Sequence, residues 1–586
     1  TLSVDRSKRS VKDGIPPLRT LLQITPVGAS TSDAVVIEVI DVETAAVQTS
    51  GGAGRAAAPP PGGTSFIVPT SVNATGAGGA VFSSDGWLKN EVSVDVVAEL
   101  IYTPQDKDGL ADADVLKATV TIPAGNTLRL SNLVTSIFQT GGTGQVEVRA
   151  ATPQALSLRT VVESVKGGEP ATRFGTEIPT TSFGAGIGAG QGELAVPGID
   201  DDTASRANLI LAETTGASAQ VNITINDSLG QQIAATATPI PVPPYGKVQI
   251  NRVVDFLKNG LTVSGGWAGV SVVSGSGKVV PVATVIDNAS TSFSAIQGRA
   301  PRSNVPGSAR SLDDTAPAPD ALAALPTTLI LPSAARLPGA FNTQFITNLA
   351  IVNPTGAPAN LTLTYNYIDA DDGSLAKSVQ KPLTIRARGA LSKETGSDVI
   401  LNLFGISNRS YGWIRVEGDV ARVVAVSAVA AQVDPDDSSK GFKSAQVNGI
   451  FSDSPDVMGP GDTEHRFAGT EKSVQRRTNL ILVETASQPC SVVLRAYGAT
   501  GDKLAESTVT IRPNEYKQIN DILGTGAGAL GLGDGPYQNV GVSAQVTASG
   551  SCKVVALATV NDNISKNPEI FILKAPGPGS ELTIGF

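Results

Sequence analysis

The chain has 586 residues, a formal net charge of −9, 62 glycines and 37 prolines, and only 4% aromatic residues. This length exceeds what one hydrophobic core can hold and predicts roughly four domains, with a turn-rich, β-branched composition typical of all-β proteins. The 44 Lys and Arg residues do not cluster, which argues against nucleic-acid binding, and no run reaches the roughly 18 apolar residues of a membrane span.

Residues 1–65 form a predicted N-terminal extension with one or two strands and a Gly/Pro linker. The chain starts at Thr1 without a signal peptide, which favours a processed, exported protein, although a trimmed piece would look the same. In the segment DAVVIEVIDV, Val35, Ile37 and Val39 alternate onto one strand face and Ile40 lies on the other. If unpaired, this strand could add to an open sheet edge of a neighbouring copy and link copies head to tail. The alternative is that it pairs within its own chain.

Three stretches repeat one pattern. TNLAIVNPTGAPANLTLTYNY starts at Thr347, and related stretches start at Ala207 and Thr478. In each, Asn-Leu opens an apolar run, a polar turn interrupts it, and an alternating strand follows. Further landmarks keep the same order, including short apolar helical turns such as NRVVDFL and SDVILNLF, where Asn or Ser is placed to cap the turn.

These landmarks predict an N-terminal extension and four β-sandwiches of about seven strands each, rather than propeller blades or a β-helix, whose repeats are shorter. The predicted segments are sandwich 1 (66–176), sandwich 2 (177–301), a Pro/Ala-rich linker (302–327), sandwich 3 (328–447), sandwich 4 (448–573) and a tail (574–586).

The third repeat carries three distinctive blocks, FITNLAIVNP from Phe345, DVILNLFG from Asp398 and YGWIRV from Tyr411. With these blocks the chain resembles the tandem immunoglobulin-like sandwich repeats of large exported bacterial surface proteins. The first repeat departs from the pattern, since NEVSVDVVAEL stands where the Asn-Leu block is expected, and the fourth lacks the Trp. The resemblance implies an extracellular or cell-surface scaffold and carries over no catalytic residue.

The two cysteines, Cys490 and Cys552, both lie in the last repeat, where earlier copies carry Ala219 and Gly277. Because both positions changed together, a disulfide is predicted, closing a loop of about 60 residues and adding on the order of 4 kcal/mol of stability. A disulfide in turn indicates an oxidising compartment.

Signals for catalysis are scarce. His465 is the only histidine, no G-x-S-x-G motif accompanies it, and it is predicted to be a surface residue. No His/Cys cluster has zinc-ligand spacing. The glycine runs lack the strand, helix and Lys of a phosphate-binding loop. We therefore predict a protein that is not an enzyme.

Acidic loops are the candidate metal sites, because calcium prefers clustered carboxylate oxygens. The alternative is that the Asp-Gly and Asp-Asp-Gly segments form turns and bind no calcium. No cofactor is otherwise predicted. The candidate ligands are Asp106, Asp108, Asp112, Asp114, Asp369, Asp371 and Asp372.

Trp267 and Trp413 occupy equivalent repeat positions, whereas Trp87 lies elsewhere, in SDGWLKN. Exposed aromatic platforms bind sugars, but this placement favours packing in a core.

The sequence thus predicts an extracellular or cell-surface structural protein, a stalk or filament subunit that self-associates into a polymer or surface array. The alternative is a monomeric adhesin that binds a glycan or a host-surface protein. Neither nucleic acid nor a membrane span is expected.

Overall fold

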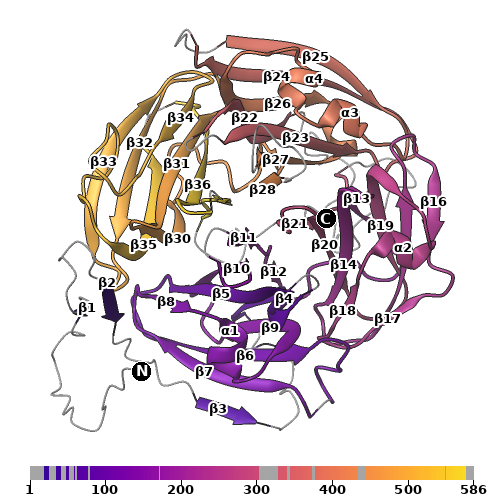
Figure 1. The fold of residues 1–586 in the computed structure, drawn as a ribbon, viewed down its shortest axis with the longest axis horizontal. Helices are drawn as coiled ribbons and strands as arrows, with labels where there is room; N and C mark the ends of the chain where they lie inside the picture. The colour runs from indigo at the N-terminus through magenta and orange to yellow at the C-terminus, as the bar shows by residue number, and fades with distance from the viewer. Residues whose placement is uncertain are drawn as a thin grey trace. The chain divides into compact units, whose positions relative to one another are not determined.

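A computed structural model divides the chain into two compact units, Thr1–Val47 and Gln48–Phe586. The structure describes residues 19–24, 35–40, 48–51, 59, 62–76, 79–111, 113–169, 172–302, 328–339, 343–371, 377–432, 442–547, 550–565 and 567–575. The described residues of both units lie mainly in antiparallel strands, which confirms the predicted all-β class (Figure 1). None of the helices in these ranges is long and apolar enough to cross a membrane.

The smaller unit contains a two-stranded sheet in which β1 (Arg19–Ile24) pairs with β2 (Val35–Ile40). The strand proposed as a donor therefore pairs within its own chain, which is the alternative that the sequence left open. Each of these two strands has one edge outside this sheet. Strand addition to a neighbouring copy stays a prediction.

The larger unit contains four strand sets whose strands follow a similar order, whereas the short helices differ from set to set. Set 1 consists of β4 (Thr64–Thr75), β5 (Ala80–Asn90), β6 (Val96–Pro104), β7 (Leu116–Ile122), β8 (Thr127–Leu130), α1 (Leu133–Phe138), β9 (Gly142–Ala150), β10 (Leu156–Lys166), β11 (Phe174–Glu177) and β12 (Thr181–Ser182), and β3 (Gln48–Gly51) pairs with β7. Set 2 consists of β13 (Leu194–Asp201), β14 (Ser205–Glu213), β15 (Ala219–Asn226), β16 (Gln232–Ala235), β17 (Ile240–Val242), β18 (Lys247–Ile250), α2 (Val253–Leu257), β19 (Val263–Gly275), β20 (Val279–Asp287) and β21 (Phe293–Gln297).

Set 3 consists of β22 (Thr328–Pro338), β23 (Gln344–Val352), β24 (Ala359–Asp369), β25 (Lys377–Ile385), α3 (Lys393–Gly396), α4 (Val399–Asn402), β26 (Ser410–Gly418), η5 (Val420–Arg422), β27 (Val424–Gln432), β28 (Phe442–Asn448) and β29 (Ile450–Phe451). Set 4 consists of β30 (His465–Lys472), β31 (Arg476–Glu484), β32 (Cys490–Tyr497), β33 (Lys503–Ile511), β34 (Tyr516–Ile519), β35 (Tyr537–Val546), β36 (Val554–Asp562) and β37 (Pro568–Ile572). The predicted domain boundaries stay predictions. Most of the predicted linker 302–327 and of the tail 574–586 lies outside the described residues.

Each set pairs its strands into two antiparallel layers, here called sheets A and B. The A sheets are β7-β6-β9-β4, β16-β15-β19-β13, β25-β24-β26-β22 and β33-β32-β35-β30. The B sheets are β8-β5-β10-β11, β18-β14-β20-β21, β23-β27-β28 and β34-β31-β36-β37. In set 2 the layers are separate sheets, whereas in the other sets the first strand pairs with strands of both layers.

The core of each set lies between its two layers, as in a β-sandwich. In set 2, for example, Leu209 of sheet B packs with Val221 and Val270 of sheet A in one buried cluster. The alternation of buried and partly exposed residues along β15 and β32 is the period of two that a strand with one face in a core requires.

Contacts between the sets close into a cycle. Sheet B of each set contacts the preceding set, through β4 with β14, β13 with β23, β26 with β34 and, from set 4 back to set 1, β30 with β5. The last strands of the B sheets, β11, β21, β28 and β37, also contact one another in the same cyclic order. In Figure 1 the sets can be followed along the colour bar until β30 and β35 return beside β5 and β8.

The junction that closes this cycle contains buried charge. Arg159 of set 1 lies 3.0 Å from Glu569 of set 4, and its guanidinium carbon lies 3.6 Å from the ring centre of Phe571. Trp87 belongs to the same buried cluster as Phe467 of set 4 and donates to Oδ1 of Asn539 at 3.2 Å. Burial lowers the pKa of Arg159 to about 10, against the attraction of Glu569. Set 4 is therefore held to set 1 by side chains that are costly to separate.

The asparagine of the repeated Asn-Leu motif fixes the short helical segment. The backbone N–H of Arg252 donates to Oδ1 of Asn208 at 3.0 Å, and Asp398 and Asp521 donate in the same way to Asn348 and Asn479. These three donor residues have left-handed backbones, with φ of +48°, +41° and +49°. The predicted capping by the Asn or Ser just before the helix is therefore wrong, because α1, α2 and α4 receive no side-chain cap from that neighbour.

Set 1 carries the same motif in a form that the sequence analysis missed. Oδ1 of Asp85 accepts from the N–H of Asn132 at 2.8 Å, and Asn132 is also left-handed, with a φ of +46°. The counterpart of Asn-Leu in set 1 is therefore Asp85-Gly86, and NEVSVDVVAEL lies further along the chain. We call the Asn or Asp that accepts this backbone hydrogen bond the capping residue of its set. Trp87 lies two positions after it in set 1, as Ile210, Ala350 and Ile481 do in the other sets.

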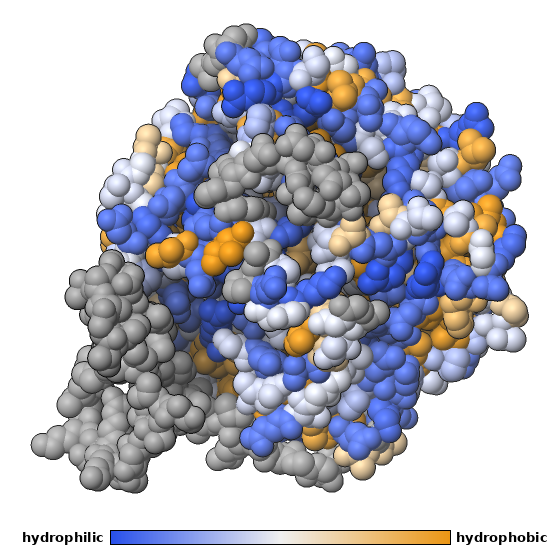
Figure 2. Space-filling model, in the orientation of Figure 1, coloured by the Kyte–Doolittle hydropathy of each residue, from blue (hydrophilic) through white to orange (hydrophobic). Residues whose placement is uncertain are grey.

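The face drawn in Figure 2 is mainly hydrophilic, with apolar residues in small separate patches. The most exposed large apolar side chains, such as Val474, Phe256 and Val94, belong to different sets. Isolated apolar residues of this kind are normal for a protein surface.

Replacing Asn208 tests the motif. Asn208→Ala leaves the Arg252 N–H without its acceptor and should lower the free energy of unfolding by about 1 to 2 kcal/mol. Asn208→Asp keeps an acceptor, as Asp85 does in set 1, and should match the wild type. Denaturant midpoints measure both, and equal midpoints for the Ala and Asp variants would contradict the role assigned to this hydrogen bond.

Candidate binding site

The B sheet of set 3 presents a grid of small side chains towards set 2. Directly paired residues of antiparallel strands lie on the same sheet face. Three rows therefore cross β23, β27 and β28, and they are Ile346–Ala430–Ser444, Asn348–Ala428–Gln446 and Ala350–Val426–Asn448.

The equivalent rows in the other sets carry larger side chains. The row that contains Ala350 corresponds to Ile481–Leu557–Ile572 in set 4. The Ile481 and Leu557 side chains join a buried apolar cluster with Ile330 and Trp413 of set 3, so that junction is filled. In set 1 the corresponding pair is Trp87 and Arg159.

The residue that faces Ala350 from the opposite wall of this junction is also small. Gly198 of β13 lies at a bulge with a φ of +69°, and a Cβ placed on it would lie 3.6 Å from the Ala350 Cβ. Gly469 occupies the corresponding bulge of β30, with a φ of +82°, and there the Trp87 indole comes within 2.7 Å of the same imagined Cβ. At the junction of sets 4 and 1 the space beside the glycine is thus filled by Trp87, whereas beside Gly198 the nearest side chains are Ala350 across the junction and Ile296 of the same set.

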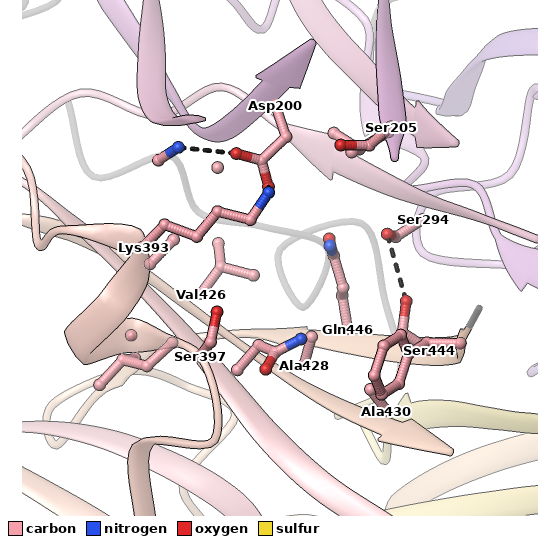
Figure 3. A pocket seen from close by; sticks show the side chains of 18 of the residues that line it. Asp200, Ser205, Ser294, Lys393, Ser397, Val426, Ala428, Ala430, Ser444 and Gln446 are labelled. Atoms are coloured by element: carbon pink, nitrogen blue, oxygen red, sulfur yellow. Dashed lines mark hydrogen bonds and ion pairs between the residues drawn. The ribbon is translucent and has the colours of Figure 1, made fainter. Parts of the chain in front are cut away.

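The result is a cavity of about 520 Å³ between sets 2 and 3 (Figure 3). Its volume falls within the range of small-molecule sites, about 300 to 1,000 Å³. Val426, Ala428 and Ala430 supply an apolar wall, and the Asp200 and Lys393 side chains point towards each other at one end.

Asp200 and Lys393 form a partly buried charge pair. Their side chains lie 3.4 Å apart, and Lys393 also reaches Asp202 at 3.1 Å, while Asp200 accepts from the Gly265 N–H at 2.6 Å. Burial raises the pKa of Asp200 by more than Lys393 and this N–H lower it. Burial acts to lower the pKa of Lys393, but attraction to the two carboxylates outweighs it, so the pKa is raised. Asp200 and Asp202 therefore keep Lys393 in its charged form, and both carboxylates also accept hydrogen bonds from other groups.

Asp287 is the other charged side chain that lines the cavity in the part of the chain that the structure describes, and its carboxylate accepts from the backbone N–H groups of Ala289 and Ser290. The remaining polar groups are neutral. The Ser294 and Ser444 hydroxyl oxygens lie 3.5 Å apart, and the Ser205 hydroxyl donates to Asp202. Oε1 of Gln446 is buried and has no hydrogen-bond partner among the described residues. Gln446 as a residue lines the cavity and adds a neutral amide to its wall.

The three tryptophans are buried, as their placement predicts, but they pack between sets rather than inside one core. Nε1 of Trp267 donates to the Arg388 carbonyl of set 3 at 2.9 Å, and Nε1 of Trp413 donates to the Asn514 carbonyl of set 4 at 3.0 Å. None is an exposed platform for a sugar.

The acidic loops have partners other than a metal. Asp108 accepts from the Leu110 N–H at 2.8 Å, Asp114 lies 3.0 Å from Lys107, and Asp106 accepts from Gln105. The other loop is similar, since Asp369 pairs with Lys377 at 2.8 Å and Asp371 accepts from the Arg409 N–H. Asp112 and Asp372 lie outside the described residues. Within the described ranges no three His, Cys, Asp or Glu side chains converge on a metal position, and calcium binding stays a prediction.

Cys490 and Cys552 form a disulfide with their Cα atoms 5.7 Å apart, which confirms that prediction. The prediction for His465 is wrong. Its side chain is only 2% exposed and lies at the start of β30, where Nδ1 is 3.3 Å from the Leu573 carbonyl. A polar flanking sequence suggested a surface loop, but strand pairing with β35 buries this residue.

Comparisons with known proteins add little. No family model matches the chain, and no curated protein matches it. Among solved structures, the crystal structure of Thermotoga maritima 1070 matches with 16% sequence identity and a TM-score of 0.16, over 22% of this chain and 94% of that one. A likeness this weak identifies neither a family nor a function.

The buried histidine makes stability depend on pH. Burial lowers the pKa of His465 from 6.5 to about 4, so the neutral ring is favoured in the folded protein. The contribution of the neutral ring to the free energy of unfolding is fully present above pH 6.5. It decreases by about 3 kcal/mol as the pH falls to 4. Unfolding measured from pH 8 to 4 should therefore show a steeper acid loss for the wild type than for His465→Gln. Parallel curves would contradict this assignment.

Proposed function

We propose that the protein is a non-enzymatic, extracellular binding protein whose ligand occupies the cavity between sets 2 and 3. In this proposal each strand set is one immunoglobulin-like β-sandwich domain. The ligand is a compact molecule with an apolar face and several hydroxyl groups, of the size of a mono- or disaccharide. This corresponds to the adhesin alternative of the sequence analysis.

The proposal rests on the cavity at the junction between sets 2 and 3. Protein interiors are normally close-packed, and a void loses dispersion contacts on every wall. The equivalent junction between sets 3 and 4 is filled by Ile481 and Leu557, so the fold itself does not require a cavity at this place. The neutral polar residues that line the cavity, among them Ser294, Ser444 and Gln446, support a ligand with hydroxyl groups.

The cycle of contacts favours this proposal over a stalk. In a linear stalk each domain contacts only its neighbours along the chain, whereas here β30 of set 4 contacts β5 of set 1. A closed cycle restrains the walls of the cavity, which reduces the entropy that a ligand must overcome. Self-association through the free edges of the β1–β2 sheet is compatible with this proposal.

The disulfide supports an exported location, because such bonds persist mainly in oxidising compartments.

The test uses a panel of neutral and amino mono- and disaccharides, measured by calorimetry with the whole chain. At least one sugar should bind saturably to the wild type. Ala350→Trp should abolish that binding, because it copies the Trp87–Gly469 arrangement against Gly198 and fills the cavity. The cost in stability should stay within about 1 to 3 kcal/mol.

The matched control is Val474→Trp, which adds an indole at a position that is 95% exposed. It should bind as the wild type does. A panel without saturable binding, or equal binding by Ala350→Trp and the wild type, would overturn the proposal.

A further inference from the structure

The junction between sets 1 and 2 contains a second cavity, of about 730 Å³. It lies at the place equivalent to the first cavity, with β4 on one wall and the B sheet of set 2 on the other. Its chemistry differs, because both of the charged side chains that line it are cations, Arg206 and Arg252.

One row of the B sheet joins a cation to an apolar surface. Arg206 of β14 pairs with Ile286 of β20, which pairs with Phe293 of β21, so their side chains lie side by side on one face. Phe293 also packs against Phe82 of set 1, with ring centres 5.9 Å apart. The guanidinium thus stands at the end of an apolar strip.

The two arginines are unequally neutralised. Arg252 pairs with Asp201 at 3.1 Å, and that carboxylate is only 1% exposed. Arg206 donates to the neutral Oδ1 of Asn288. Burial, and then repulsion by Arg252, lowers the pKa of Arg206, although Asp201 opposes them. Asp255 stands beyond Asp201 and does not line the cavity. An anion beside Arg206 would relieve this repulsion.

The opposite end of the cavity is backed by Lys247, and burial lowers the pKa of this lysine to about 7. Lys247 is fully buried, and its ammonium donates to the Thr70 and Thr143 hydroxyls at 2.8 and 2.6 Å. Both threonines line the cavity, and their hydroxyl oxygens lie 3.5 Å apart, so at least one hydroxyl proton is available to another acceptor. Lys247 pairs with Ala212, and at about 3.3 Å per residue this places it about 20 Å along β14 from Arg206.

We propose that this cavity binds an amphipathic organic anion, with the anionic head at Arg206 and an extended apolar body along Ile286, Phe293 and Phe82. The row crosses two strand spacings of about 4.8 Å from Arg206 to Phe293, and the Phe82 ring centre lies 5.9 Å from that of Phe293, which suits an acyl chain of roughly ten carbons. The apolar walls remove that chain from water at about 0.8 kcal/mol per CH₂. This site is separate from the one in the proposed function.

The test compares decanoate with 1-decanol, which has the same chain without the charge, by calorimetry on the whole chain. Decanoate should bind saturably, and at least about tenfold more tightly than the alcohol, because a charge-assisted contact contributes more than 1.4 kcal/mol. Arg206→Gln should weaken decanoate at least about tenfold and remove the preference over decanol.

Two control variants show whether decanoate occupies this cavity and no other part of the protein. Arg512→Gln makes the same exchange at an arginine whose side chain is 57% exposed on set 4, and it should bind decanoate as the wild type does. Ala350→Trp fills the other cavity and should also leave decanoate binding unchanged. No saturable binding, equal affinity for acid and alcohol, or an unchanged affinity in Arg206→Gln would overturn the proposal.

Discussion

The hydrogen bond from a left-handed backbone N–H to an Asn or Asp side chain is the interaction on which each strand set depends. It links the second strand of a set to the residue that opens the segment before the last strand of sheet A, about 40 to 50 positions later in the chain, as in Asn208 with Arg252 and Asn348 with Asp398. A residue other than glycine rarely adopts that conformation, and its backbone N–H there has no partner within the helical segment and is satisfied by the side-chain oxygen. The bond therefore fixes where the helical segment lies against sheet B. The rows of sheet B side chains next to this helical segment then face the neighbouring set.

The four junctions show how one framework produces different surfaces. The position two residues after the capping residue holds Trp87, Ile210, Ala350 or Ile481. Where it holds Trp or Ile481, the junction is filled by aromatic, apolar and charged groups. Beside Ile210 and Ala350 the junctions keep cavities. Because these positions face a neighbour rather than a core, their size can change without disturbing the sandwich-like pairing that defines each set.

Much of the fold follows from sequence pattern. Alternation predicts the strands, the repeated Asn-Leu block shows the repeat, and the joint replacement of Ala219 and Gly277 by cysteine predicts the disulfide. The sites do not follow, because the cavities form between residues that lie more than a hundred positions apart, such as Gly198 and Ala350. The same limit explains Trp87 and His465, whose partners come from strands that local sequence cannot identify. Aligning the four repeats on the capping residue would have shown one signal, the small Ala350 where the other sets carry Trp or Ile.

The central claim is that set 4 packs against set 1 and closes the cycle of contacts. A double-mutant cycle on Arg159 and Glu569, whose side chains lie 3.0 Å apart across that junction, tests it most directly. Arg159→Met and Glu569→Gln should each destabilise the protein, and the double variant should recover a coupling energy of at least about 1.5 kcal/mol in denaturant unfolding. A coupling energy within about 0.5 kcal/mol of zero would show that the two residues do not meet and would contradict the closed cycle.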